Sequence, residues 1–147
     1  MIHNKISVLY VDDEQDNLFS FKATFRIKYR VLTALNGEEA LNLLGTKLVH
    51  VIISDQRMPQ MTGAELFEKV QEKYPDPMRL LLTGYTDMNA VIEAVNKGKI
   101  FHYLTKPWNE EELVTTIERA YAAWVEKQSL KSANEQLEFL LRQNLLS

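Results

Sequence analysis

Five short apolar stretches alternate along the chain with segments of helical periodicity, and this order restricts the fold more than any other feature. The stretches are rich in Val, Ile and Leu and cover residues 6–11, 29–35, 48–54, 78–83 and 100–104. The first, third and fourth are nearly continuous, as in strands of a parallel sheet that are buried on both faces. The alternation predicts an α/β fold in which helices cover both sides of one sheet.

The segments between these stretches carry apolar residues at the spacing of one helical face. The sets are Leu18, Phe21 and Phe25; Ala40 and Leu44; Leu66, Phe67 and Val70; and Val91, Ala94 and Val95. With a fifth helix after residue 108, they predict a (βα)5 doubly wound, five-stranded parallel sheet. In such a sheet, ligands bind beyond the carboxyl ends of the strands.

The last helix has the clearest predicted start. Asn109 can cap it, with Glu112 at the third helical position, and Trp108 and Leu113 occupy the positions of a hydrophobic staple. Residues 109–147 contain no Gly or Pro, so the helix is expected to continue well past the domain. We therefore divide the chain into a domain at 1–125 and a C-terminal helical extension at 126–147.

Composition excludes several classes of function. A net charge of -3 offers no basic surface, so we expect no direct binding of nucleic acid by this chain. The absence of Cys excludes disulfide and thiolate chemistry. The sequence shows no signal peptide and no apolar run long enough to span a membrane. We expect a cytoplasmic protein that does not associate with membranes.

Charged and hydroxyl side chains follow four of the predicted strands. Asp12 and Asp13 follow the first, Asp55 the third, Thr83 the fourth and Lys106 the fifth. Because parallel strands end at one edge, three carboxylates would meet there and repel one another unless a cation compensated their charge. Oxygen ligands favour Mg²⁺ or Mn²⁺, and the lack of Cys and of clustered His disfavours zinc. Taken alone, the acids at 12–14 are better explained by helix capping.

Four motifs, in this order and on these elements, resemble the receiver (CheY-like) domain of two-component response regulators. They are VDDE after the first strand, SDQRMP after the third, LLTGY at the fourth and YLTKPW at the fifth. The resemblance spans residues 5 to about 125 and implies the flavodoxin-like strand order 2-1-3-4-5. The segments LLTGYTD and GKIFHYLTKPWN further resemble those of receivers attached to HD-GYP phosphodiesterases or to σ54-type activators.

The resemblance assigns the acids to phosphoryl transfer. It implies that Asp55 is the phosphoacceptor and that Asp13 and Asp55 bind Mg²⁺ (or Mn²⁺) directly. The backbone carbonyl of Arg57 would be a further ligand, and Asp12 would reach the metal largely through water. The phosphodonor would be a sensor histidine kinase, a phosphotransfer protein or a small phosphodonor. The chain would then be a signalling switch that accepts and slowly hydrolyses a phosphoryl group, and not an enzyme in the ordinary sense.

The remaining motif residues are assigned by the same resemblance. Thr83, Gly84 and Lys106 would contact the phosphoryl group, and Tyr103 would be the aromatic residue that reports the switch. A cis bond before Pro107 would aim the lysine across the strand ends. Without the other motifs, Tyr103 would be taken as an ordinary edge residue with its hydroxyl in water.

Arg57 and Tyr85 occupy positions that flank the path of the attacking water in the family. We expect this bulky pair to slow the loss of the phosphoryl group from Asp55.

The C-terminal extension has two interpretations. A heptad seam is formed by Leu130, Asn134, Leu137, Leu141 and Asn144 or Leu145. It favours a parallel coiled-coil homodimer that leads to an output domain, although a frayed linker explains the same segment equally well. The face formed by the fourth helix, the fifth strand and the fifth helix is a second candidate for dimerisation.

Two other functions remain open to the sequence alone. A haloacid-dehalogenase-like phosphatase also forms an aspartyl phosphate with Mg²⁺, but it carries a second acid two positions after the nucleophile, where this chain has Arg57. A pseudo-receiver that acts only by binding proteins would typically lack Asp55, Asp13 or Lys106, and all three are present.

Overall fold

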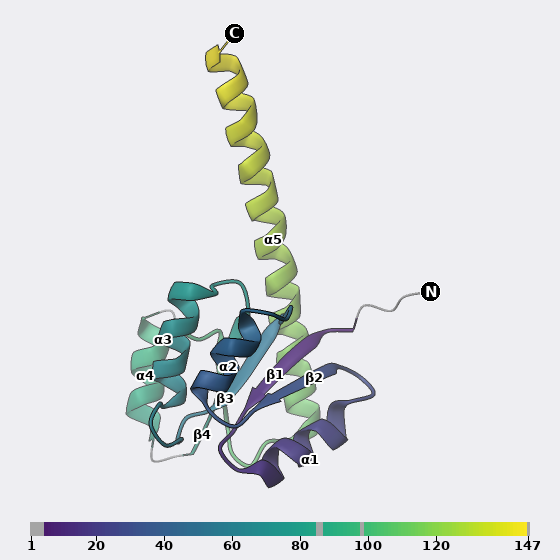
Figure 1. Cartoon of the computed structure of the whole chain (residues 1–147), viewed down its shortest axis with the longest axis vertical. Helices are drawn as coiled ribbons and strands as arrows, with labels where there is room; N and C mark the ends of the chain where they lie inside the picture. The colour runs from purple at the N-terminus through teal and green to yellow at the C-terminus, as the bar shows by residue number, and fades with distance from the viewer. Residues whose placement is uncertain (1–4, 85–86, 98, 147) are drawn as a thin grey trace.

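The computed structural model describes residues 5–84, 87–97 and 99–146. Its centre is a five-stranded parallel sheet in the order β2-β1-β3-β4-β5, which confirms the predicted fold class and strand order. Figure 1 labels strands β1 to β4 of this sheet. The strands are β1 (Ser7–Val11), β2 (Arg30–Ala34), β3 (Val51–Asp55), β4 (Met78–Thr83) and β5 (His102–Thr105). Each strand falls on a predicted apolar stretch, with ends that differ by at most three residues; the largest difference is the start of β3, at residue 51 and not 48.

Five helices cover the two faces of the sheet. They are α1 (Gln15–Phe25), α2 (Gly37–Leu44), α3 (Gly63–Lys73), α4 (Met88–Asn96) and α5 (Glu110–Leu146). Core residues of α1 and α5 form one cluster with alternate residues of the central strands, and residues of α2, α3 and α4 form a second cluster with the others. The arrangement is the doubly wound architecture, with one hydrophobic core on each side of the sheet.

Strand β1 shows how the sequence divides its residues between these two cores. Val8 and Tyr10 belong to the α1–α5 side, whereas Leu9 and Val11 belong to the side of α2, α3 and α4. All four are essentially inaccessible to solvent. Because successive side chains of a strand point to opposite faces, a continuous apolar run is needed to fill both layers.

Side-chain caps precede helices α2, α3 and α5. The side chain of Asn36 accepts a hydrogen bond from the backbone of Glu39 at 2.8 Å before α2, and Asn109 accepts one from Glu112 at 3.0 Å before α5, as the sequence predicts for Asn109. A full capping box precedes α3, formed by Thr62 with Glu65. This box has the spacing S/T-x-x-E, so the sequence contained its signal as well.

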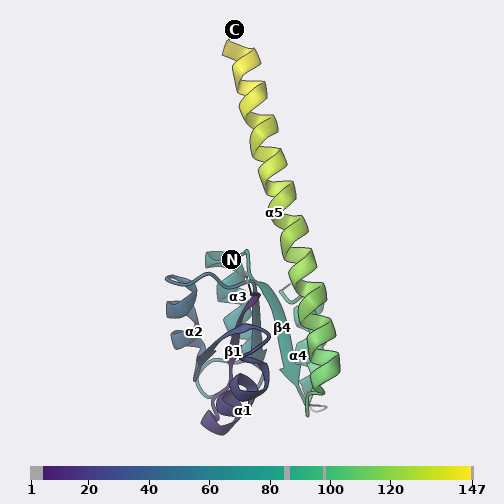
Figure 2. The ribbon, with the colours of Figure 1, turned by 90° about the vertical axis from the view of Figure 1, so that its right-hand side faces the viewer.

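Helix α5 is anchored at the sheet by His50 and then leaves the body of the domain (Figure 2). The His50 ring contacts the rings of Tyr121 and Trp124 edge-on, at centroid distances of 5.1 and 4.5 Å, and its Nδ1 accepts the backbone N–H of Ser7 at 2.9 Å. Burial, with a smaller contribution from a nearby arginine, lowers the pKa of His50. The Nζ of Lys127 donates to the Pro75 carbonyl at 2.8 Å, and the large apolar residues from Leu130 to Leu145 are exposed.

Candidate functional site

The register of the sheet brings the predicted site residues to one edge. Val11 pairs with Ser54, so the next residues, Asp12 and Asp55, lie beside each other at the ends of β1 and β3. Carboxylate oxygens of Asp12, Asp13 and Asp55 lie within 4.8 Å of one another. Asp12 and Asp55 are buried and Asp13 is exposed. Three carboxylates at this distance form a group of oxygen ligands of the kind that binds hard divalent cations.

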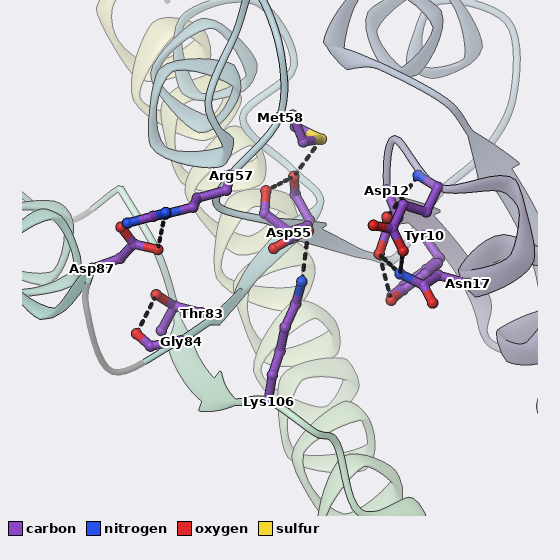
Figure 3. Close-up of polar contacts among 12 residues, drawn as sticks. Tyr10, Asp12, Asn17, Asp55, Arg57, Met58, Thr83, Gly84, Asp87 and Lys106 are labelled. Atoms are coloured by element: carbon purple, nitrogen blue, oxygen red, sulfur yellow. Dashed lines mark hydrogen bonds and ion pairs between the residues drawn. The ribbon is translucent and has the colours of Figure 1, made fainter.

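Lys106 reaches this group from the end of β5. Its Nζ lies 2.6 Å from Oδ2 of Asp55, and Figure 3 shows the side chain extended across the strand ends toward that carboxylate. The backbone N–H of Lys106 donates to the Thr83 carbonyl at 3.0 Å, and the bond between Lys106 and Pro107 is cis. The lysine side chain is 37% exposed, so its ammonium retains contact with solvent while it pairs with a buried acid.

The electrostatics of Asp55 reflect both burial and the lysine. Burial raises the pKa of Asp55; the hydrogen bond and charge of Lys106 lower it, and the nearby Asp12 raises it. The net shift is upward. The lysine therefore compensates only part of the cost of holding this carboxylate ionised, and additional positive charge would stabilise it further.

Asp12 is held by three hydrogen-bond donors. The Tyr10 hydroxyl donates to Oδ2 at 3.2 Å, the Asn17 amide donates to the same oxygen at 3.1 Å, and the Glu14 backbone N–H donates to Oδ1 at 2.9 Å (Figure 3). Burial, followed by the charge of Asp12, raises the pKa of Tyr10. The sequence analysis missed Tyr10 and Asn17. A signal for Tyr10 was present, because residues two apart on a strand share a face.

Gly63 lies against the backbone of Asp55 and helps to fix its position. A Cβ built on this residue would lie 2.5 Å from the backbone oxygen of Asp55 and 2.7 Å from a methyl group of Leu81. No side chain fits between α3 and the end of β3 without moving one of them. The start of α3 therefore packs directly against the backbone of Asp55.

Thr83 and Gly84 lie at the end of β4. The buried Thr83 hydroxyl donates to the Gly84 carbonyl at 3.1 Å in this structure. A Cβ at Gly84 would meet no described atom within 4 Å. The space beside the Gly84 backbone is thus open in the described part of the chain.

Arg57 forms an ion pair that the sequence analysis did not anticipate. Its Nε lies 3.1 Å from each carboxylate oxygen of Asp87, the residue that precedes α4 (Figure 3). The pair connects the loop after β3 with the start of α4. Asp87 could not be recognised from local patterns, because 30 residues separate it from Arg57. Tyr85, the expected companion of Arg57, lies outside the described residues.

Tyr103 is half-buried on β5. It packs against the core cluster on the side of α2, α3 and α4, and its ring centroid lies 5.7 Å from that of His102. Its position between core and surface is compatible with a ring that changes its degree of burial.

Comparison with known proteins decides the family. The sequence model of the response regulator receiver domain matches residues 8–118, which is most of the chain. The chain belongs to the response regulator receiver domains. Receivers of this family are signalling switches of two-component systems; they interact with histidine kinases or phosphotransfer proteins and generally bind Mg²⁺ at an acidic pocket.

Individual relatives agree with this assignment. The receiver is 37% identical over 142 residues to the hydrogenase transcriptional regulatory protein HoxA of Cupriavidus necator, covering 97% of this chain and 29% of HoxA. It is 36% identical over 93 residues to the DNA-binding transcriptional regulator NtrC of Escherichia coli, covering 63% of this chain and 20% of NtrC. The chain thus spans less than a third of the length of these regulators.

Solved structures show the same fold. The signal receiver domain of an HD domain-containing protein from Pseudomonas fluorescens superimposes with a TM-score of 0.80 at 29% identity, covering 88% of this chain and 96% of that one. A structure described as an adenylate cyclase from Rhodopirellula baltica gives a TM-score of 0.82 at 30% identity, covering 92% and 98% of the two chains. Among the described residues of the receiver, no helix combines the length and apolar character needed to cross a bilayer.

The raised pKa of Asp55 predicts how stability depends on pH. Below its ordinary pKa of 3.8, Asp55 is protonated in both the folded and the unfolded protein. Above its raised folded-state pKa, Asp55 is charged in both, and only the folded protein bears the cost of burying that charge. Ionisation of Asp55 therefore lowers the free energy of unfolding as pH rises through this window. Asp55→Asn should unfold at higher urea concentration than the wild type at pH 7 without divalent cations, and this advantage should shrink toward pH 3.

The control is Asp16→Asn, which removes an equal charge from an exposed position in the first turn of α1. It should be neutral or slightly destabilising, because a carboxylate near a helix N-terminus is favourable. Equal stability changes for both variants would contradict the assigned role of burial at Asp55.

Proposed function

We propose that this chain is a phospho-accepting receiver in which Asp55 takes a phosphoryl group from a histidine kinase or phosphotransfer protein. The observation that carries the proposal is the buried Asp55 carboxylate, which has Lys106 at 2.6 Å and two further carboxylates within 4.8 Å. Capping explains none of these contacts, since they join the ends of three different strands. Family membership favours this function over the haloacid-dehalogenase-like alternative.

The transfer needs charge neutralisation more than a general base. An Asp55 oxygen forms a bond to phosphorus as the bond between phosphorus and the donor nitrogen breaks, and the donor imidazole leaves with the electron pair. Lys106 neutralises one phosphoryl oxygen, and the Thr83 hydroxyl with the Gly84 N–H binds another. The open space beside Gly84 allows this close approach.

The acids fit a bound Mg²⁺ or Mn²⁺, because the group offers carboxylate oxygens with an uncompensated negative charge. Asp13, Asp55 and the Arg57 carbonyl would hold the cation, with Asp12 reaching it through water. When bound, it supplies positive charge to the phosphoryl group. In its absence, the charge of Asp12 disfavours the ionised state of Asp55, and an incoming dianion is repelled.

The switch would begin at Thr83. Its hydroxyl now donates to Gly84, and a phosphoryl group on Asp55 would offer it a charged acceptor instead. Movement of Thr83 toward that acceptor leaves space which the half-buried Tyr103 ring can enter, and the surface formed by α4, β5 and α5 changes. This local charge event would control dimerisation or an output domain.

Incubation with a small phosphodonor and Mg²⁺ tests the central step. Intact mass spectrometry should show one added phosphoryl group on the wild type and none on Asp55→Asn, because the carboxylate is the nucleophile. Asp16→Asn is the matched control and should be modified like the wild type. An unmodified wild type, or equal modification of Asp55→Asn, would refute the proposal and favour a pseudo-receiver.

Arg57 and Tyr85 are proposed to slow the hydrolysis of the phosphorylated site. The pair with Asp87 supports this for Arg57, because it holds the guanidinium on the β4–α4 side of Asp55 (Figure 3). The double variant Arg57→Ala, Tyr85→Ala should lose its phosphoryl group several-fold faster, as followed by intact mass after removal of the donor. An unchanged decay rate would show that access of water is controlled elsewhere.

The extension at 126–147 is proposed to form a parallel coiled coil with a second copy. Leu130 and Leu137 on the seam are 59% and 56% exposed. With these at d positions, Asn134 takes an a position, where a polar residue favours a defined dimer. In the same register, Glu126 at g would face Lys131 at e of the second copy, which adds charge complementarity.

Light scattering with and without beryllofluoride tests this dimer. Leu137→Glu should convert a dimer to a monomer, because the charge would lie in the seam. Phe139→Glu is the control, since Phe139 is equally exposed at 60% but lies off the seam. A wild type that is monomeric in both states would support the alternative of a linker without a partner.

A further inference from the structure

Three hydrogen-bond donors hold the buried carboxylate of Asp12. Oδ2 accepts hydrogen bonds from the Tyr10 hydroxyl and from the Asn17 amide, and Oδ1 accepts the backbone N–H of Glu14. Asp12 has no exposed surface. Donors on both oxygens fix the plane of the carboxylate, and two donors on one oxygen leave little freedom to rotate it.

Tyr10 is a rigid donor. Its ring is stacked on Phe21 at a centroid distance of 4.1 Å with an interplanar angle of 3°, and Phe21 in turn meets the edge of Trp108 at 6.0 Å. The residue is 1% exposed. The ring therefore cannot move its hydroxyl away from Asp12 without disturbing an aromatic cluster between β1, α1 and the β5–α5 connection.

Asn17 joins the carboxylate to the start of α1. Its Nδ2 donates to Oδ2 of Asp12 and to the Glu14 side chain, both at 3.1 Å. One amide thus connects two acids whose charges repel each other. Its loss would leave the Asp12 carboxylate with one fixed hydrogen-bond donor fewer.

A cavity of about 360 Å³ lies next to these groups. It is lined by Tyr10, Asp12, Asn17, Lys106, Pro107 and Trp108. The lining includes Asp12, the two residues that donate hydrogen bonds to it, and Lys106. The volume is sufficient for several water molecules, each of which takes about 30 Å³ in the liquid. The pocket therefore has room for water beside the residues that hold Asp12.

From these contacts we propose that Tyr10 and Asn17 are positioning residues of the divalent-cation site, because they fix the Asp12 carboxylate in the orientation that holds the water of the cation. The proposal rests on the cation site of the proposed function and adds two residues to it. Neither residue touches the cation or the phosphoryl group. Removal of a residue that hydrogen-bonds to a metal ligand commonly weakens metal binding about tenfold or more.

Calorimetric titration of the metal-free chain with MgCl₂ tests the proposal. Tyr10→Phe removes only the hydroxyl and should weaken Mg²⁺ binding about tenfold, and Asn17→Ala should weaken it similarly. Tyr29→Phe is the matched control: its ring is buried in the same core cluster, and its hydroxyl donates to Glu118 at 3.2 Å, outside the acid cluster. It should bind Mg²⁺ like the wild type.

A second measurement separates positioning from general damage. Phosphorylation from a small phosphodonor is followed as the Mg²⁺ concentration is raised. Both variants should need more Mg²⁺ to reach half of their maximal rate, and they should reach the wild-type rate at saturation. A rate that stays low at saturating Mg²⁺ would assign the residues to folding or to chemistry and overturn the proposal.

The outcomes distinguish this inference from the proposed function. If the wild type binds Mg²⁺ and both variants bind it equally well, Tyr10 and Asn17 have no positioning role. If Tyr10→Phe does not fold, Asn17→Ala decides, because Asn17 lies at the surface end of α1 and is only partly buried. If the wild type itself binds no Mg²⁺, the cation site of the proposed function is refuted and this inference with it.

Discussion

The ion pair between Lys106 and Asp55 is the contact on which the rest of the site depends. It connects the ends of β5 and β3 across the intervening β4 and partly offsets the desolvation of a buried carboxylate. Without a cation in that place, Asp55 would be driven toward its neutral form, in which it is a poor nucleophile. Under the proposed function, the Lys106 ammonium would also lie next to the negative charge of the phosphoryl group, so one side chain would serve both the free and the modified acid.

The sheet makes this pair possible, and its two cores hold it in place. Parallel strands end together, so five separate segments deliver their last side chains to one edge. On the opposite side of Asp55, Gly63 allows the start of α3 to pack against the Asp55 backbone, which limits movement of that backbone away from Lys106. The backbone of Asp55 is therefore packed against the start of α3, and its carboxylate is paired with Lys106. The geometry of the acidic edge is a property of the whole fold and not of the loops alone.

The sequence predicted the features that repeat or that follow from parallel topology. Continuous apolar runs such as Val8 to Val11 identified strands buried on both faces, and their shared direction predicted that Asp12 lies near Asp55, as it does in the structure. Side-chain contacts within loops could not be obtained in this way. The Arg57–Asp87 pair depends on how two connections fold over the strand ends, and the Asn17 contact depends on the entry angle of α1.

Helix α5 runs unbroken from Glu110 to Leu146, with its first turns fixed in the receiver core and its last turns beyond it (Figure 1). At about 1.5 Å per residue, residues 126–146 span about 30 Å along the helix axis. A rigid rod of this length acts as a lever. A tilt of only about 10° at the core would displace the far end by about 5 Å, more than the spacing between neighbouring residues along the chain. A rearrangement too small to alter the packing of the receiver could therefore become a large change in where the chain presents its last turns.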